Sequence, residues 1–282
     1  MKYSNENRRR LLKQFASMTV LGAVNILRSP GILATTGASK KKGRIDGFEG
    51  SVVHKHDKIY EDWRQSMVWH RSKPKRYPDV IVQAQNEMDV IAAVKHAAGN
   101  GHKIAVHSGG HNASCASVRN SGMLLDVGSM VNLDIDKEKQ VASIQPGVRS
   151  IQLMAAARNQ SLSFPVPHCP TVGLSGFTMG GGQGWNWGSR EGMACFSIVA
   201  ADIVTADGQL RHASPTENPD LYWAVRGAGP GFFGVVTRLW LKLYPLPLAI
   251  HASNYIIPLD RLDEVTAIAD KLVKVKDGRV EL

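Results

Sequence analysis

The stretch from His168 to Gly184 limits the fold more than any other part of this chain. It reads His-Cys-Pro-Thr-Val-Gly-Leu-Ser-Gly-Phe-Thr-Met-Gly-Gly-Gly-Gln-Gly, and six of its seventeen residues are glycine. Glycine allows a positive φ and lets another molecule come close to the backbone N–H groups. Successive amides in such a loop form a concave site that suits phosphate oxygens. The stretch therefore predicts a phosphate clamp with the thiol of Cys169 at its edge.

The positive charge of the chain is concentrated at its N-terminus. The net charge is +10, but residues 1–44 hold ten Lys or Arg and one acidic residue, whereas the remainder holds 24 basic and 23 acidic residues. A nearly neutral body lacks the basic stripe that nucleic-acid phosphates require, so we expect no nucleic-acid partner. A hydrophobic content of 43% and a charged content of 21% are typical of a soluble globular protein.

Residues 1–38 have the order of an export signal. The segment Asn7–Lys13, Asn-Arg-Arg-Arg-Leu-Leu-Lys, precedes an apolar run from Phe15 to Leu27 and then small residues. This order is typical of signal peptides, and the paired arginines resemble a twin-arginine signal, which predicts a periplasmic location. A disordered basic tail or a short interfacial helix is the alternative. The apolar run is too short to cross a bilayer, so we expect no stable membrane span.

The following residues predict strands and helices without strict alternation, which indicates an α+β fold. Residues 39–72 are polar, and we expect an irregular strap. Asp79–Ala84, a helix capped by Asn86 with Asp89 in a capping box, and Lys103–Val106 predict a β-α-β unit. One helix is expected after Ser150, which would be its N-cap residue, and another after Asn218-Pro219. Further strands are expected at Met123–Asp126, Gln140–Ile144, Ile198–Thr205, Gln209–His212 and Phe233–Tyr244, with a hairpin turn at Asp207-Gly208.

Three other patterns do not identify a functional site by themselves. Gly229–Gly234 matches a dinucleotide fingerprint by letter, but it follows a helix and opens a strand, so a tight turn is the better interpretation. His107 and His111 frame a Ser-Gly-Gly at a strand end, which is compatible with a polar turn or with a phosphate-bearing ring ligand. The three cysteines are too few for a disulfide framework and match no zinc spacing, although an exported protein could pair two of them.

Taken together, these motifs resemble a known family. Ser108–His111, Cys169–Gly184, Asp220–Gly227 and Phe233–Thr237 occur in the order found in the FAD-binding domain of the vanillyl-alcohol oxidase / p-cresol methylhydroxylase (PCMH-type) superfamily. Within it, the berberine bridge enzyme-like oxidases are the most similar. The resemblance covers roughly Lys73 to Pro247. It implies a PCMH-type FAD-binding domain of two α+β subdomains, with FAD as the cofactor.

The resemblance also implies roles for individual residues. His111 matches the histidine that bonds to the flavin 8α-methyl group, and Cys169 matches the cysteine that bonds to ring carbon C6 in bicovalent members. The loops 108–112 and 171–182 would hold the pyrophosphate and ribityl chain, and Val235 and Val236 would lie near adenine. The predicted cofactor-binding residues are His107, Ser108, Gly109, Gly110, His111, Asn112, Cys169, Thr171, Val172, Gly173, Gly176, Phe177, Gly180, Gly181, Gly182, Val235 and Val236.

The chain departs from the family pattern at three places in this domain. His107 stands where the family usually has Arg, and Phe177 stands where berberine bridge-type members often have His. Phe232-Phe233-Gly234 replaces an Asn-Phe-Gly. Phe177 removes a polar contact to the ring or ribityl chain, which affects flavin tuning more than tethering.

Residues 248–282 correspond only to the start of a substrate domain, with an expected strand at Asn254–Ile257 and a helix at Leu259–Val273. The resemblance implies an FAD-dependent oxidoreductase that accepts hydride from a small alcohol- or sugar-like substrate, with oxygen as final acceptor. We expect a truncated or split product, or one completed by a second chain, and the sequence identifies no catalytic base and no metal site. The alternatives are a catalytically incomplete FAD-binding fragment and, more remotely, a phosphate-binding domain without flavin.

Overall fold

The computed structural model describes residues 45–184, 192–249 and 251–275. The chain divides into two units, residues 1–43 and residues 44–282, and every described residue lies in the second unit. The predicted export signal lies outside the described residues and stays a prediction. Within the described part, no helix combines the length and apolar character needed to cross a bilayer.

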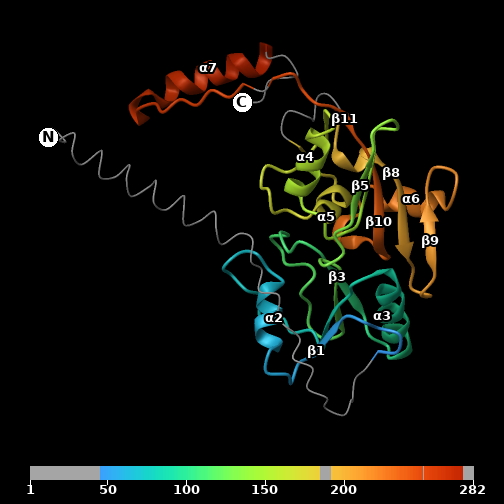
Figure 1. Cartoon of the computed structure of the whole chain (residues 1–282). Coiled ribbons are helices and arrows are strands. Elements are labelled where there is room, and N and C mark those ends of the chain that lie inside the picture. Colours follow the sequence, from blue (N-terminus) through green and yellow to red (C-terminus); the bar gives the residue numbers. More distant parts are fainter. Residues whose placement is uncertain (1–44, 185–191, 250, 276–282) are drawn as a thin grey trace. The chain divides into compact units, whose positions relative to one another are not determined.

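The first half of the described chain forms a four-stranded sheet in the order β1-β2-β4-β3 (Figure 1). Its strands are β1 (Ser51–His54), β2 (Val80–Gln83), β3 (Ile104–His107) and β4 (Met123–Asp126). β2 and β3 both run parallel to β4, and helix α3 (Glu87–Gly99) connects β2 to β3. The predicted β-α-β unit is therefore confirmed, with β4 inserted between its two strands.

Helix α3 begins at the predicted cap, but the capping box is wrong. The side chain of Asn86 accepts a hydrogen bond from the backbone N–H of Asp89 at 2.9 Å. The carboxylate of Asp89, which is fully buried, accepts from the N–H groups of Gln85 (2.9 Å) and Glu49 (2.7 Å) instead of returning to Asn86. A carboxylate buried against a second chain segment satisfies the amides of that segment first.

The expectation of an irregular strap before the domain is also wrong. β1 pairs with β2 in antiparallel register, from Ser51 opposite Gln83 to His54 opposite Val80, and α2 (Tyr60–Ser66) follows it. Only Val53 of this strand is fully buried. A four-residue strand at a sheet edge gives too short an alternation to be detected in the sequence.

The second half forms a five-stranded antiparallel sheet in the order β5-β6-β10-β8-β9 and a small pair, β11-β7. Its strands are β5 (Leu133–Asp136), β6 (Val141–Ile144), β7 (Leu162–Ser163), β8 (Ile198–Val204), β9 (Leu210–Ala213), β10 (Val235–Lys242) and β11 (Tyr244–Pro245). The predicted hairpin at Asp207-Gly208 is confirmed, because β8 and β9 pair directly and Gly208 has φ +70°. β10 ends two residues earlier than expected.

Short helices join the strands of this second half. They are α4 (Ser150–Arg158), α5 (Leu174–Met179), the 3-10 turns η1 (Ala194–Ser197) and η2 (Gly229–Gly231), and α6 (Pro219–Val225). Pro219 occupies the first turn of α6 as predicted, but the Asn218 amide donates to the carbonyl of His212 and does not cap the helix. Ser150 does not cap α4 either, since Arg149 is the N-cap residue.

Three apolar clusters support these sheets, and one of them joins the halves. Under the five-stranded sheet, Ile203, Leu239 and Leu241 are fully buried in one cluster. Under the four-stranded sheet, Leu125 packs in a cluster that also contains Val235 from β10. The predicted α+β class, with two α+β halves, is therefore confirmed.

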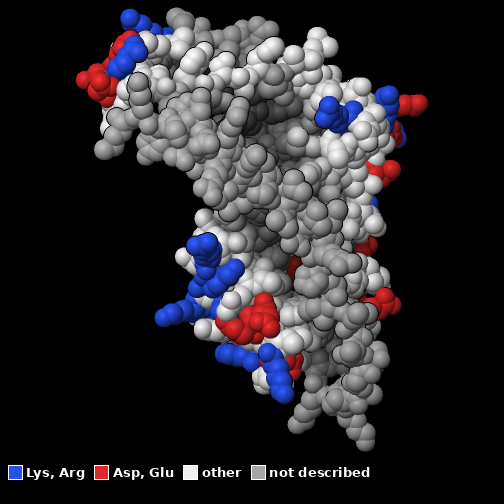
Figure 2. Space-filling view, turned by 60° about the vertical axis from the view of Figure 1, so that its left-hand side comes forward, with Lys and Arg blue, Asp and Glu red and all other residues white. Residues whose placement is uncertain are grey.

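Charges in the described part are mixed rather than separated. On the face shown in Figure 2, acidic and basic residues lie near one another in small groups. Ion pairs join opposite charges, as between Arg64 and Glu61 (2.6 Å) and between Arg211 and Asp207 (2.7 Å).

The expected strand at Asn254–Ile257 is not formed. Residues 251–258 have no regular secondary structure and are exposed, and then η3 (Leu259–Arg261) and α7 (Leu262–Val275) follow. A strand is stable only when its backbone groups pair with a neighbour, and none of the described strands pairs with this segment. The predicted helix is confirmed within two or three residues.

Candidate functional site

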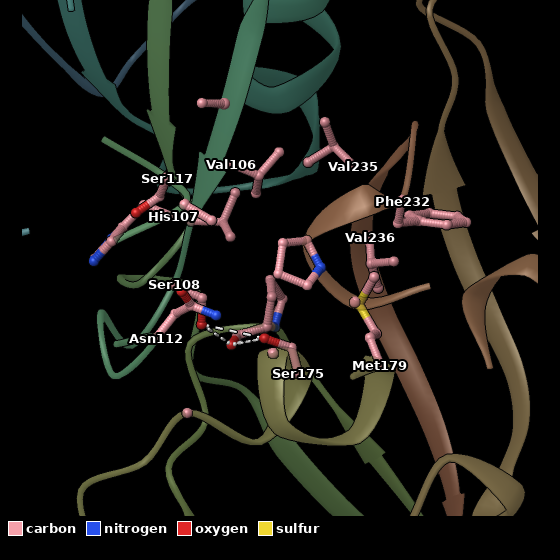
Figure 3. Close-up of a pocket in the computed structure, with 18 of the residues that line it drawn as sticks. Val106, His107, Ser108, Asn112, Ser117, Ser175, Met179, Phe232, Val235 and Val236 are labelled. Carbon is pink, nitrogen blue, oxygen red and sulfur yellow. Dashed lines mark hydrogen bonds between the residues drawn. The ribbon is translucent and has the colours of Figure 1, made fainter. Parts of the chain in front are cut away.

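A large cavity lies where the two halves meet. Its volume is about 1060 Å³, and its walls come from β3 and the following loop, from α5, and from the η2–β10 segment. Figure 3 shows Val106 of β3 and Val235 of β10 on opposite sides of this space. Small-molecule sites measure about 300–1,000 Å³, so this one suits an extended ligand of dinucleotide size.

The two loops predicted to bind phosphate meet in this cavity, at a region that we call the floor: Ser108, Gly109, Pro146, Gly173 and Ser175. The hydroxyls of Ser108 and Ser175 both donate to the carbonyl oxygen of Pro146, at 2.6 and 2.8 Å, as Figure 3 shows. The two serine oxygens lie 3.2 Å apart. These bonds fasten the loop after β3 to the N-terminal turn of α5.

Glycine at the floor permits an approach that no other residue allows. A Cβ added to Gly109 would lie 2.7 Å from the backbone nitrogen of Gly173, and Gly110 has φ +68°. Gly181 and Gly182, at the far end of α5, also have positive φ values, +109° and +73°. The glycines thus keep backbone close to the cavity with no side chain between, as a phosphate-binding loop requires.

Below the floor, a buried pair at the ends of β3 and β4 holds the loop in place. The Nδ1 atom of His107 lies 2.7 Å from Oδ1 of Asp126, whose carboxylate also accepts from Gln83 (2.9 Å) and the N–H of Gly128 (2.9 Å). Burial by itself raises the pKa of Asp126, but the hydrogen bond and charge of His107, together with these other donors, outweigh it and lower the pKa. Asp126 is therefore an ionised acceptor. His107 Nε2 has no hydrogen-bond partner in the described part of the chain.

The other side of the site is formed by side chains at an edge that we call the rim: Trp69, His111, Cys169 and Thr171. The hydroxyl oxygen of Thr171 lies 3.0 Å from Nε2 of His111 and 3.4 Å from Sγ of Cys169. The indole of Trp69 stacks on the imidazole of His111, with ring centroids 4.9 Å apart and planes at 12°. The Trp69 Nε1–H donates to the carbonyl of His111 at 3.2 Å.

The start of α4 fixes the loop that carries Cys169 and Thr171. The first N–H groups of a helix have no partner inside the helix. Here the N–H of Ser150 donates to Val172 O (3.0 Å) and that of Ile151 donates to Pro170 O (3.1 Å). The Ser150 hydroxyl, expected to cap the helix, donates to the carbonyl of Cys169 at 3.0 Å. The loop carbonyls therefore replace the cap.

Both potential nucleophiles of the rim are shifted toward their reactive forms. Burial, and secondarily the positive charge of Arg149, lowers the pKa of His111, which favours the neutral imidazole. The hydrogen bond from the Thr171 side chain, followed by one from its backbone, lowers the pKa of Cys169 and favours the thiolate. Cys169 is half-buried, so it remains accessible to small molecules.

Most residues predicted to bind the cofactor line the cavity, but three do not. Cys169, Thr171 and Gly181 are absent from its wall. Thr171 is linked to the wall by its hydrogen bond to His111, and Cys169 is linked to it through Thr171. The predicted residues on the wall are His107, Ser108, Gly109, Gly110, His111, Asn112, Val172, Gly173, Gly176, Phe177, Gly180, Gly182, Val235 and Val236. Phe177 adds an apolar ring there.

Sequence reasoning missed several residues of the site. Ser175 lies inside the glycine-rich stretch and could have been selected by its position between Gly173 and Gly176. Pro146 and Trp69 carry no local signal, because only the tertiary fold brings them beside the two loops. All three cysteines are free, and among the described residues no group of His, Cys, Asp or Glu is placed to hold a metal ion.

Comparison with known proteins agrees with this geometry. Residues 78–214 match the family described as FAD binding domain. The FAD-linked oxidoreductase nodO of Hypoxylon pulicicidum is 37% identical over 224 residues, which is 79% of this chain and 49% of that protein. The chain thus spans about half the length of the curated relatives it matches.

Solved structures give the same result. The 6-hydroxy-D-nicotine oxidase of Arthrobacter nicotinovorans superposes with a TM-score of 0.76 at 32% identity, covering 84% of this chain and 52% of that one. BBE-like 1 of Physcomitrella patens superposes with a TM-score of 0.65 at 26% identity, covering 70% and 42%. The chain belongs to the vanillyl-alcohol oxidase / p-cresol methylhydroxylase superfamily of FAD-linked oxidoreductases, as its motifs predict.

The residues present fit the cofactor of this family. FAD is an extended dinucleotide, and the cavity offers both the volume and a floor of glycine backbone, where a Cβ on Gly109 would clash with the backbone of Gly173. The wall near Val106 and Val235 is apolar, as suits a base. FAD is therefore the cofactor of this domain.

Proposed function

We propose that this chain is the flavin-holding part of an FAD-dependent oxidoreductase whose cofactor is attached through His111 and Cys169. The observation that carries the proposal is the rim, where one hydroxyl lies within hydrogen-bonding distance of both residues (3.0 and 3.4 Å). A thiol and an imidazole so close together can reach two positions of one ring system.

Different residues of the chain would hold different parts of the cofactor. The floor glycines present backbone N–H groups to a diphosphate, and the bonds of Ser108 and Ser175 to Pro146 keep these groups in position. Val235 and Val236 supply an apolar wall for the adenine. When bound, FAD supplies the hydride-accepting ring, and attachment to protein tunes that ring.

The substrate and the final electron acceptor of the whole protein are part of the proposal. Similarity to a nicotine oxidase supports a small organic substrate and oxygen as acceptor. The alcohol- or sugar-like substrate stays a prediction, and none of the described residues is identified as a catalytic base. A catalytically incomplete FAD-binding protein would hold flavin equally well but would not reduce it with any substrate.

Acid denaturation tests the attachment. The purified chain, run on a denaturing gel after acid treatment, is expected to show flavin fluorescence in the protein band. His111→Ala and Cys169→Ala should each keep the band fluorescent through the other tether, and the double variant should release its flavin. Cys195→Ala is the matched control, since that thiol is buried away from the rim. Complete release of FAD from either single variant would contradict two attachment points.

A further inference from the structure

The hydroxyl of Thr171 is the shared neighbour of the two proposed attachment residues. It lies 3.0 Å from His111 Nε2 and 3.4 Å from Cys169 Sγ. A threonine hydroxyl has one hydrogen to donate and lone pairs to accept with. It can therefore accept a hydrogen bond from one neighbour and donate one to the other. The three side chains thus form a chain of hydrogen bonds that can run in either of two directions.

The direction of that chain of hydrogen bonds decides which atoms are nucleophilic. In one direction, Nε2–H of His111 donates to Thr171, and the Thr171 hydroxyl donates to a Cys169 thiolate. The Nδ1 atom then carries a free lone pair. In the other direction, a protonated thiol donates to Thr171, Thr171 donates to Nε2, and Nδ1 carries the imidazole proton. Only the first direction leaves both Nδ1 of His111 and Sγ of Cys169 unprotonated, so that either atom can attack.

The surroundings of the rim favour the first direction. Burial and the charge of Arg149, at the start of α4, lower the pKa of His111, so the imidazole is neutral. The Thr171 hydrogen bond lowers the pKa of Cys169, so the thiolate is favoured. The other titratable groups nearby are His168, next to Cys169 in sequence, and His70, beside Trp69 with ring centroids 6.0 Å apart.

We propose that Thr171 is a positioning residue, whose hydroxyl accepts from His111 Nε2 and donates to Cys169 Sγ, so that Nδ1 of His111 is left unprotonated and Cys169 is held as the thiolate. Two sets of contacts hold Thr171 and His111 in position. The start of α4 binds the carbonyls of Pro170 and Val172 on either side of Thr171, and Trp69 stacks on His111. The role in flavin attachment rests on the proposed function, whereas the protonation states do not.

The pH dependence of thiol alkylation tests the proposal without flavin. The full chain is produced in a riboflavin auxotroph under starvation, so that Cys169 is free, and is treated briefly with iodoacetamide at several pH values from about 6 to 9. Peptide mass spectrometry then quantifies each cysteine separately. Thr171→Val and Thr171→Ala remove the hydroxyl, and Thr171→Ser keeps it. Thr171 is exposed, so the fold has room for all three side chains.

Loss of the hydroxyl should shift the alkylation profile of Cys169 toward higher pH. A shift of one pH unit would slow the reaction about tenfold at neutral pH, because the thiolate is the reacting species. Thr171→Ser should follow the wild-type profile. Cys195 is the internal control: burial raises its pKa, and its slow alkylation should be the same in all variants as long as they are folded.

Two results would overturn the proposal. One is a wild-type profile for Cys169 in both Thr171→Val and Thr171→Ala. The other is a Thr171→Ser profile shifted as far as that of Thr171→Val, which would assign the effect to loop packing. Failure of the proposed function gives a different result, because a chain that cannot attach FAD still shows the thiol shift. Chains made with flavin present supply the second measurement, in which Thr171→Val should lose the Cys169 tether and keep that of His111.

Discussion

The floor and the rim of the cavity hold the same ligand by opposite means. The floor is made of backbone and small residues, and its hydrogen bonds run between Ser108, Ser175 and the Pro146 carbonyl. The rim is made of long or reactive side chains, joined through the hydroxyl of Thr171. We expect substitutions in the floor to affect binding itself, and substitutions in the rim to affect attachment after binding.

Gly109→Ala should have the largest effect. The new Cβ would lie 2.7 Å from the nitrogen of Gly173, so the two loops would have to separate. Overpacking of this kind costs about 1–3 kcal/mol, which corresponds to roughly 5- to 150-fold weaker FAD binding. Fluorescence quenching on FAD titration, measured in the His111→Ala/Cys169→Ala background, reports the change. Gly99→Ala is the control, because a Cβ there meets no atom within 4 Å.

If Gly109→Ala bound FAD as tightly as its parent, the floor would not be the phosphate site. If Gly109→Ala, made with His111 and Cys169 intact, lost attachment but kept binding, the floor and the rim would not be separable. Either result would remove the contrast drawn between these two regions.

Asp126→Asn should have the second-largest effect. It should lower the free energy of unfolding of the chain, because Asp126 lies beneath the floor. The NH2 group of the new amide would face that of the part-buried Gln83, so a donor would lose its acceptor at a cost of about 1–3 kcal/mol. Urea unfolding measures this cost. Asp134→Asn, at an exposed position of β5, is the matched control and should change stability little.

The pH dependence of the stability that the His107–Asp126 pair provides is a second test. The pKa of Asp126 is lower in the folded chain than in the unfolded one, so its contribution is complete above the unfolded value of about 4. It should disappear as the pH falls through the folded value. The difference between wild type and Asp126→Asn should therefore narrow below about pH 4. A difference that stayed constant down to acid unfolding would disprove an ionised Asp126.

Trp69→Ala should have the smallest effect, and only on attachment. Trp69 is 61% exposed, so it adds little to the core, but it covers one face of His111. Aromatic stacking contributes about 0.5–1.5 kcal/mol, which predicts roughly a two- to tenfold lower rate of covalent attachment. Gel fluorescence after timed addition of FAD to apoprotein measures the rate. Trp69→Phe should retain most of it, and Trp223→Ala, another exposed tryptophan, should be neutral.

The order of motifs along the chain was enough to predict the α+β class, the β-α-β unit and the two loops that meet in the cavity. Glycine-rich loops, caps such as Asn86 and the Asp207-Gly208 turn are local, because short-range sterics and hydrogen bonds fix them. The strand expected at Asn254–Ile257 shows the limit of such patterns. Its residues, Asn-Tyr-Ile-Ile, include three with high β propensity, but a strand exists only with a paired neighbour.

Contacts between residues far apart in sequence were decided by the tertiary structure alone. Nothing near Pro146 indicates that two serines will donate to its carbonyl, and nothing near Trp69 indicates that it will stack on His111. The sequence suggested that His111 and Cys169 share a ring system, but it did not reveal the Thr171 hydroxyl between them. Side-chain geometry of this kind depends on how sheets and loops pack, and no local propensity encodes it.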